Sequence, residues 1–296
     1  MADSVIARVQ SLRDWFRGYE DNFVVIGGVA CSLIMREYGA DFRATRDIDM
    51  VLLLEALNVD FGRRFWDYVL EAGYKHCQKS TGAPQFYRFY EPISTAYPEM
   101  IELFSRRVDG LVLPDGAVVT PIPISEDISS LSAILLNDDY YRFLREGVKK
   151  INGLPVLDEL YLIPFKAKAW LDLTERRNRG ERIDRNDINK HRRDIYKLSD
   201  MVREGFKFAL PETIERDMST FLISVQEHLT NIPPKEREAE KLRLEKITVI
   251  FGLPVSILRW QVSLKTRMAE GKRKAEIHNS ALRDATPHRS ETHEIG

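Results

Sequence analysis

The chain has 296 residues with 44 Lys and Arg against 45 Asp and Glu, so its net charge of −1 excludes a globally basic wrapper of nucleic acid. Its 44% hydrophobic and 30% charged residues are typical of a soluble globular protein, and its two cysteines are too few for a disulfide framework or a four-cysteine zinc site. The N-terminus lacks the apolar core of a signal peptide, and no apolar run reaches the roughly 20 residues that span a bilayer, so we expect a cytoplasmic protein without membrane contact.

The first part of the chain mixes predicted strands with predicted helices. Apolar spacing predicts a helix over 4–18, and the apolar run 23–26 suits a buried strand that ends in a tight turn at Gly27 and Gly28. The remaining elements predicted before residue 125 are helices over 29–38 and 63–72 and strands over 47–54, 86–90, 100–104 and 117–121.

From about residue 125 the pattern becomes helical. Mixed elements followed by helices alone predict an α/β or α+β first half and a helical second half. We therefore expect one domain over 1–124, an all-α domain over 125–270 and a disordered polar tail over 271–296. The predicted helices of the second domain cover 128–136, 140–147, 157–173, 187–204, 212–229 and 236–261.

Two carboxylates stand at the head of the apolar strand predicted over 47–54. Asp47 and Asp49 are two residues apart, so they project from the same face of that strand. Two such charges repel by about 4 kcal/mol at 4 Å if the effective dielectric constant is about 20. A divalent cation removes this repulsion, and Mg²⁺ bound with phosphate oxygens suits paired carboxylates. The alternative is that Asp47 is a solvated loop residue and Asp49 pairs with an arginine.

The glycine turn before the predicted helix 29–38 suits a phosphate. Backbone N–H groups and the dipole at a helix N-terminus attract anions, and glycine lets a ligand approach the backbone closely. Arg43, Thr45 and Arg46 would supply further donors beside the phosphates. The alternative is that Gly27 and Gly28 serve only packing.

A third carboxylate is expected if two metal ions share the site. Glu102 lies on the strand predicted over 100–104, which is otherwise apolar, and buried glutamates are rarely unpaired. The alternative role for Glu102 is a salt bridge to Arg106 or Arg88.

The combination of Gly27-Gly28, Asp47-x-Asp49 and an acidic strand residue resembles the polymerase-β-type nucleotidyltransferases. More narrowly, the segments RATRDIDMVL (43–52) and FKAKAWLDL (165–173) resemble the AbiEii/AbiGii-type nucleotidyltransferase toxins of bacterial toxin–antitoxin and phage-defence systems. The resemblance spans most of residues 20–200. It implies an α+β fold in which an N-terminal mixed-sheet, polymerase-β-like domain precedes an all-α domain.

The chain departs from this family at two positions. Many relatives carry Gly-Ser where this chain has Gly27-Gly28, which removes a hydroxyl donor to the phosphate. The third acid is Glu102, where an aspartate is usual in the family.

The resemblance extends to two helical segments of the second half. It implies that Lys166 contacts the nucleotide triphosphate, with Lys168 as the alternative, and that Asp194 is the last active-site residue. The structural alternatives are a lysine that snorkels from a helix flank, and an aspartate that pairs with Lys190 or Lys197.

A local excess of positive charge surrounds these segments. Residues 166–197 contain eleven Lys and Arg and six Asp and Glu, which could guide a polyanion towards the site or form a solvated face. His191 lies inside this run, and no other histidine is spaced to form a zinc site with it.

The resemblance implies an enzyme that uses Mg²⁺ or Mn²⁺ to move a nucleoside monophosphate from an NTP to an acceptor hydroxyl. It also implies that the chain is a toxin, that the acceptor is RNA, most plausibly a tRNA 3′ end, and that a cognate antitoxin protein exists. The expected catalytic residues are Asp47, Asp49, Glu102, Lys166 and Asp194; the first three bind metal, and Gly27, Gly28, Thr45, Arg46, Lys166 and Lys168 bind the nucleotide.

There are two alternatives, one within the same chemistry and one in a different class. A small-molecule acceptor such as an aminoglycoside would favour an acidic cleft around Glu91, Glu99 and Glu102, whereas RNA would favour a basic one. The second is a catalytically inactive, nucleotidyltransferase-like module that acts by binding, for instance to a partner protein; a failure to bind Mg²⁺ and NTP would favour it.

Overall fold

The computed structural model describes residues 2–43, 45–53, 56, 58–78, 84–104, 111–112, 118–119, 134–135, 137–229 and 233–258. Contacts group Met1–Leu253 into one compact unit and Pro254–Gly296 into a second. The described part of the second unit contains the short 3-10 helix η2 (Val255–Ile257). All other described elements belong to the first unit. No helix among the described residues is long and apolar enough to cross a membrane.

The predicted elements of the N-terminal part are confirmed, with shifted ends. The helix predicted from residue 63 begins at Val59, because the side chain of Asn58 caps it by accepting a hydrogen bond from the backbone N–H of Phe61 at 2.8 Å. Two short strands, β3 and β6, were not predicted. The elements are α1 (Ala2–Trp15), β1 (Phe23–Ile26), α2 (Gly27–Glu37), β2 (Asp47–Leu52), α3 (Val59–Glu71), β3 (Lys75–Gln78), β4 (Pro84–Tyr90), β5 (Met100–Phe104), β6 (Leu111–Val112) and β7 (Val118–Val119).

A seven-stranded mixed sheet forms the core, with the strand order β3-β4-β5-β2-β1-β9-β8. The central strand β2 runs antiparallel to β1 and parallel to β5. All four residues of β1 are buried, as is β2 from Met50 to Leu52, so both faces of the sheet are covered here. Asp47 and Asp49 therefore lie at the start of a strand whose remaining residues are buried in the sheet.

The expectation of helices alone after residue 125 is wrong for the hairpin of β8 (Val148–Ile151) and β9 (Leu154–Leu157). Asn152 and Gly153 connect these strands with φ angles of +50° and +83°, and Asn-Gly is the preferred sequence of such two-residue turns. All four residues of β9 are buried, and the strand runs parallel to β1, which extends the sheet. The division of the chain at residue 124 stays a prediction, since that position lies outside the described residues.

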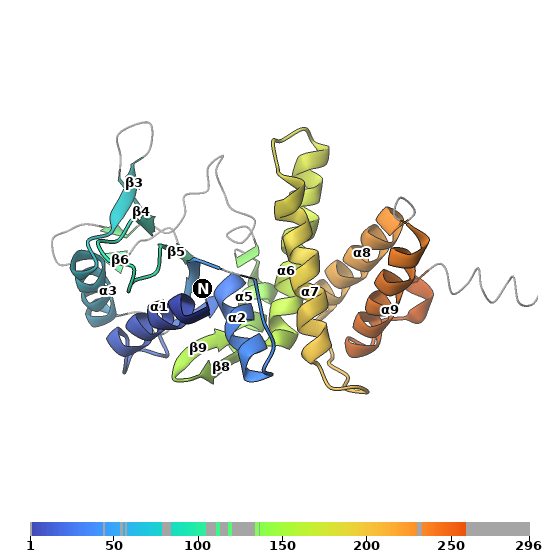
Figure 1. Cartoon of the computed structure of the whole chain (residues 1–296), viewed down its shortest axis with the longest axis horizontal. Helices are drawn as coiled ribbons and strands as arrows, with labels where there is room; N and C mark the ends of the chain where they lie inside the picture. The colour runs from blue at the N-terminus through green and yellow to red at the C-terminus, as the bar shows by residue number, and fades with distance from the viewer. Residues whose placement is uncertain are drawn as a thin grey trace, which may run out of the picture. The chain divides into compact units, whose positions relative to one another are not determined.

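Helices make up the rest of the first unit, as predicted. α6 and α7 form an antiparallel hairpin, which Figure 1 shows as two helices side by side. The last helix ends before the predicted residue 261, because Gly252, with a φ of +61°, follows it. The predicted helix 128–136 and the tail 271–296 fall largely or wholly outside the described residues. The helices are α5 (Asp138–Glu146), α6 (Glu159–Asn178), α7 (Arg185–Met201), α8 (Glu212–His228) and α9 (Pro234–Ile250).

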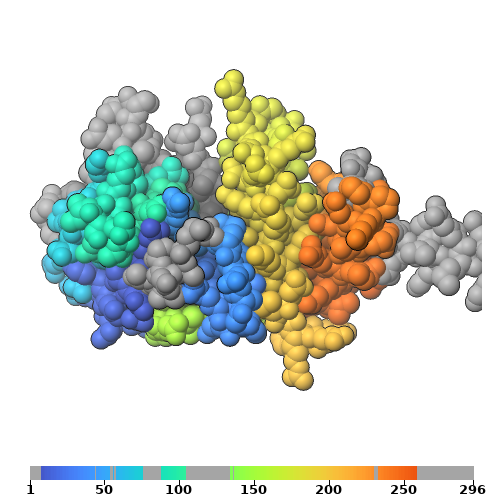
Figure 2. Space-filling model, viewed as in Figure 1, coloured from blue at the N-terminus to red at the C-terminus, as the bar shows by residue number. Residues whose placement is uncertain are grey.

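Helix α2 connects the sheet to the α6–α7 hairpin. Its buried residues, from Val29 to Met35, pack between β1 and β2 on one side and α6 and α7 on the other. The surfaces of α2, in blue, and of the hairpin, in yellow, adjoin in Figure 2. The N-terminus of α2 and the first residues of β2 therefore face the α6–α7 hairpin.

Candidate active site

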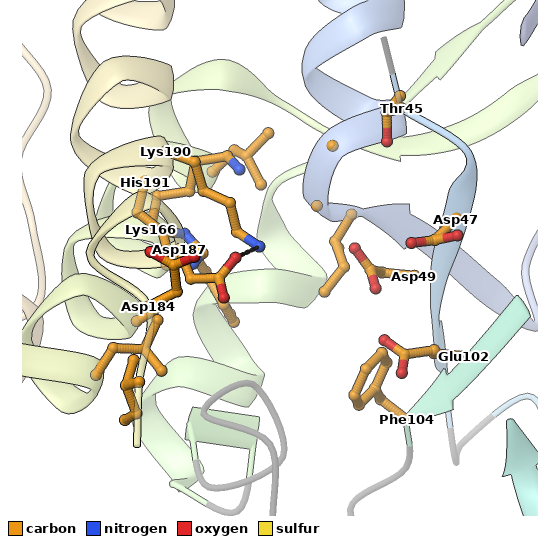
Figure 3. A pocket seen from close by; sticks show the side chains of 18 of the residues that line it. Thr45, Asp47, Asp49, Glu102, Phe104, Lys166, Asp184, Asp187, Lys190 and His191 are labelled. Atoms are coloured by element: carbon orange, nitrogen blue, oxygen red, sulfur yellow. Dashed lines mark hydrogen bonds and ion pairs between the residues drawn. The ribbon is translucent and has the colours of Figure 1, made fainter. Parts of the chain in front are cut away.

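A cavity of about 470 Å³ lies between the sheet and the α6–α7 hairpin. Its walls come from the start of α2, the segment before β2, the strands β2 and β5, and both helices of the hairpin. Figure 3 shows Asp47, Asp49 and Glu102 on the sheet side, opposite Lys166, Asp184, Asp187, Lys190 and His191 on the helical side.

The sheet wall brings together the three carboxylates predicted from the sequence. Asp49 of β2 is directly opposite Glu102 of the parallel strand β5, and Asp47 is two residues earlier on the same face of β2. All three side chains line the cavity. The pairing of β2 with β5 therefore assembles two acidic segments that are 53 residues apart in the sequence.

These carboxylates destabilise one another's charged forms. Burial, Glu102 and Asp47 together raise the pKa of Asp49 to about 7, although Lys166 opposes the shift. Burial and the negative charges of Glu102 and Glu99 also raise the pKa of Asp47. A bound cation would relieve this repulsion, and carboxylate oxygens are ligands of Mg²⁺. The chemistry of the donors thus fits a divalent metal, although no three Asp, Glu, His or Cys side chains within the described ranges form a ready metal site.

Glu102 also makes the salt bridge named as its alternative role. Oε1 of Glu102 lies 2.6 Å from Nε and 2.5 Å from Nη2 of Arg88, on the adjacent strand β4. Arg88 therefore orients the carboxylate of Glu102 beside Asp49. An arginine in this position offsets part of the negative charge of the cluster.

The glycine turn lies against the carboxylates. Gly27 has a φ of +69°, and a Cβ atom built on it would lie 1.7 Å from Oδ2 of Asp49. Gly28 has an ordinary φ, but a Cβ atom there would lie 2.6 Å from Oγ1 of Thr45. Thr45 thus places a hydroxyl beside the position that a side chain at residue 28 would occupy. The helix begins at Gly27, so the N–H groups of its first turn, which have no partner within the helix, lie next to the acidic cluster.

Lys166 and Asp194 contact each other on the helical wall. Nζ of Lys166 lies 2.8 Å from Oδ2 of Asp194, and both side chains are buried. Arg43, which precedes β2, donates to the same carboxylate through Nε at 3.3 Å and Nη2 at 3.1 Å. Although burial alone raises the pKa of Asp194, Lys166 and Arg43 lower it below its usual value. Asp194 therefore joins the segment before β2 to the α6–α7 hairpin.

We expect Lys166→Met to destabilise the fold by about 3 kcal/mol, because it removes one partner of a buried ion pair. The control is Lys168→Met, which removes a more exposed ion pair with Asp217 and should cost less than about 1 kcal/mol. Urea unfolding at pH 7.5 measures both changes. Since the pKa of Asp194 is lowered, its contribution to stability is present above about pH 4 and is lost as the pH falls further. Equal losses for the two lysine variants would contradict this assignment.

Two predicted nucleotide-binding residues do not line the cavity. Arg46 pairs with Glu99 at 3.3 Å, and Lys168 pairs with Asp217 at 2.9 Å. The acidic residues expected to mark a cleft for a cationic substrate are also paired: Glu99 binds Arg8 at 2.7 Å, and Glu91 binds Lys75 at 2.7 Å. Of the three acids named for that cleft, Glu102 lines the cavity.

Several residues of the helical wall were not predicted as site residues from the sequence. Asp184 caps α7 by accepting a hydrogen bond from the N–H of Asn186 at 2.8 Å, and Lys190 pairs with Asp187 at 3.0 Å (Figure 3). Burial, Lys166 and Lys190 lower the pKa of His191 to about 3, so its ring is neutral at physiological pH. The signal that could have found these residues is the Asp-x-x-Asp spacing at the start of a helix, which puts both acids on one face.

The sequence matches no protein-family model, and no curated protein is significantly similar to it. Among solved structures, the chain is distantly similar to the antibiotic-resistance factor ANT(2'')-Ia. The TM-score is 0.34 and the sequence identity is 12%, over 78% of this chain and 100% of the other. A similarity of this size shows nothing about the function of this chain.

Proposed function

We propose that this chain is a metal-dependent nucleotidyltransferase, which moves a nucleoside monophosphate from an NTP to an acceptor hydroxyl. The observation that carries this proposal is the contact between Gly27, at the start of α2, and Asp49. A helix N-terminus attracts anions, whereas a carboxylate cluster attracts cations. A complex of an NTP with Mg²⁺ suits both features, because its phosphates can bind to the helix N-terminus and its cation to the carboxylates.

Each residue of the sheet wall has a role in this proposal. Asp47, Asp49 and Glu102 would hold Mg²⁺ or Mn²⁺, which when bound neutralises charge on the phosphates. The N–H groups at the start of α2 and the hydroxyl of Thr45 bind phosphate oxygens. The acceptor oxygen attacks the α-phosphorus as its proton leaves, and pyrophosphate departs. Glu102 either completes the metal site or accepts that proton.

Residues of the helical wall position the nucleotide in this proposal. Lys166 is a cation at the cavity, held by the buried carboxylate of Asp194. Asp194 acts on the reaction through Lys166 and Arg43, so it is a positioning residue.

The proposed acceptor is RNA, with a tRNA 3′ end as the first candidate, and the proposed biological role is that of a toxin with a cognate antitoxin. These finer assignments depend on the resemblance of the segments 43–52 and 165–173 to AbiEii/AbiGii-type toxins. A small-molecule acceptor such as an aminoglycoside is the alternative. The similar structure is described as that of an antibiotic-resistance factor, but this similarity is too distant to support either acceptor.

We expect label from an α-³²P-labelled NTP to appear on an acceptor in the presence of Mg²⁺ and to be absent when EDTA is added. Each of the four NTPs is incubated with the protein and either total tRNA or an aminoglycoside panel, and products are separated by electrophoresis and thin-layer chromatography. Label on tRNA supports the RNA acceptor, and label on an aminoglycoside supports the alternative. No label in any reaction, together with no thermal shift on adding Mg²⁺ and NTP, would overturn the proposed activity.

A further inference from the structure

Among the described residues, five cationic side chains line the cavity, and four of them have carboxylate partners. Arg43 and Lys166 share Asp194, Arg176 contacts Glu181 at 2.7 Å, and Lys190 contacts Asp187 at 3.0 Å. The fifth is Arg182, in the turn between α6 and α7. Within the part of the chain that the structure describes, no carboxylate lies within ion-pair distance of Arg182.

The turn that carries Arg182 has a defined backbone. Gly180 follows α6 with a φ of +95°, and its N–H donates to the carbonyl of Arg177 at 2.9 Å. The ion pair between Arg176 and Glu181 closes the turn, and Asp184 then caps α7. Residue 182 is therefore held at the rim of the cavity, while its exposed side chain keeps its charge available to a ligand.

The charge of an NTP favours such a residue. A triphosphate carries about four negative charges near pH 7.5, and the charge of a divalent ion is shared between the phosphate oxygens and the carboxylates that would hold the ion. Lys166 and Arg43 together contribute one net positive charge, because the charge of Asp194 cancels the other. An arginine without a carboxylate partner offers up to five N–H donors in a planar group that matches phosphate geometry.

We propose that Arg182 binds the terminal phosphates of the NTP, and so distinguishes the triphosphate from the monophosphate. This inference rests on the proposed nucleotidyltransferase activity, because it places the NTP in the same cavity. Arg182 belongs to the α6–α7 hairpin, whereas Asp49 and the start of α2 belong to the sheet wall, so the phosphate chain is held from two walls. The residue is a substrate-binding residue and takes no part in proton transfer.

The test compares nucleotide affinities of the full chain and its variants. Dissociation constants are measured by isothermal titration calorimetry with Mg²⁺ for the NTP, NDP and NMP of each of the four bases. Arg182→Gln should weaken NTP binding about ten-fold or more, as expected for loss of a charged hydrogen bond, and should leave NMP binding unchanged. Arg182→Lys should restore part of the loss, because it keeps the charge but not the planar donor group.

Arg179 and Arg185 provide matched controls. Both are exposed arginines on the same hairpin, and neither lines the cavity. Arg179→Gln and Arg185→Gln should therefore leave the ratio of NTP to NMP affinity as in the unmodified chain. If the unmodified chain binds NTPs and Arg182→Gln binds them equally well, the role of Arg182 is wrong while the proposed activity stands. If the unmodified chain binds no nucleotide, the proposed activity is wrong, and this inference with it.

Discussion

Asp49→Asn is expected to lower the rate of nucleotidyl transfer by at least about a thousand-fold while the protein stays folded. Asparagine keeps the shape of the side chain but removes the charge that would hold a metal ion next to the phosphates. Positioning and electrostatic stabilisation supply most of the rate in such chemistry, so the loss of a central charge is costly. The label-transfer reaction described above measures the rate, and circular dichroism reports the fold.

The stability of this variant is a second measurement of the same residue. The pKa of Asp49 is raised to about 7, so between about pH 4 and pH 7 the folded state holds a proton that the unfolded state has lost. Without metal, the free energy of unfolding therefore falls as the pH rises through this window. Asp49→Asn removes that fall, and the melting temperature of the variant at pH 8 should equal or exceed that of the unmodified chain.

Asp21→Asn is the control for Asp49→Asn. Asp21 is an exposed residue just before β1 and does not line the cavity, so its replacement should change neither the transfer rate nor the pH dependence of stability. Full metal-dependent transfer by Asp49→Asn would refute the assignment of Asp49. A loss of folding in that variant would contradict the expectation that the fold does not need this carboxylate.

Gly27→Ala is expected to lower transfer by about a hundred-fold or more and to destabilise the fold. The backbone at Gly27 has a positive φ, which costs an L-residue roughly 1–2 kcal/mol. The added Cβ would also lie 1.7 Å from Oδ2 of Asp49, so the carboxylate has to move. A displacement of about 1 Å in a catalytic group can cost about a hundred-fold in rate.

Two other glycines separate the effects of backbone strain and of contact with Asp49. Gly39, just beyond the other end of α2, has a φ of +68°, but nothing lies within 4 Å of the Cβ that it would gain. Gly39→Ala should therefore cause a similar backbone strain and leave transfer unchanged. Gly28→Ala has no positive φ and only pushes the Thr45 hydroxyl aside, so its loss of activity should be smaller than that of Gly27→Ala. Equal activity losses in the Gly27 and Gly39 variants would mean that the contact with Asp49 is unimportant.

Local patterns in the sequence predicted the central part of the fold and the acidic cluster. The alternation of side chains along a strand has a period of two, so the positions of Asp47 and Asp49 on one face follow from their spacing alone. The apolar residues after Asp49 and the apolar run of β1 predicted buried neighbouring strands. The same reasoning identified Glu102, because an acid inside an apolar strand is unusual.

The hairpin of β8 and β9 shows a signal that was present but not used. Asn152-Gly153 is the preferred sequence of a tight hairpin turn, but the surrounding chain has a helical pattern, and a hairpin was not predicted. Its position beside β1 could not be predicted in this way. Pairing between strands that are about 130 residues apart depends on how the whole sheet packs.

By itself, the sequence determined most of the helices, the central strands and which carboxylates share a face, since these follow from the periodicity of a few neighbouring residues. Only the tertiary structure decided the partners of the charged side chains. Glu102 pairs with Arg88, Lys166 with Asp194, and Lys168 with Asp217, whereas Arg182 stays available at the rim of the cavity. The physical reason is that an ion pair requires approach to within about 4 Å, and residues far apart in the chain reach that distance only when the sheet and the α6–α7 hairpin have packed.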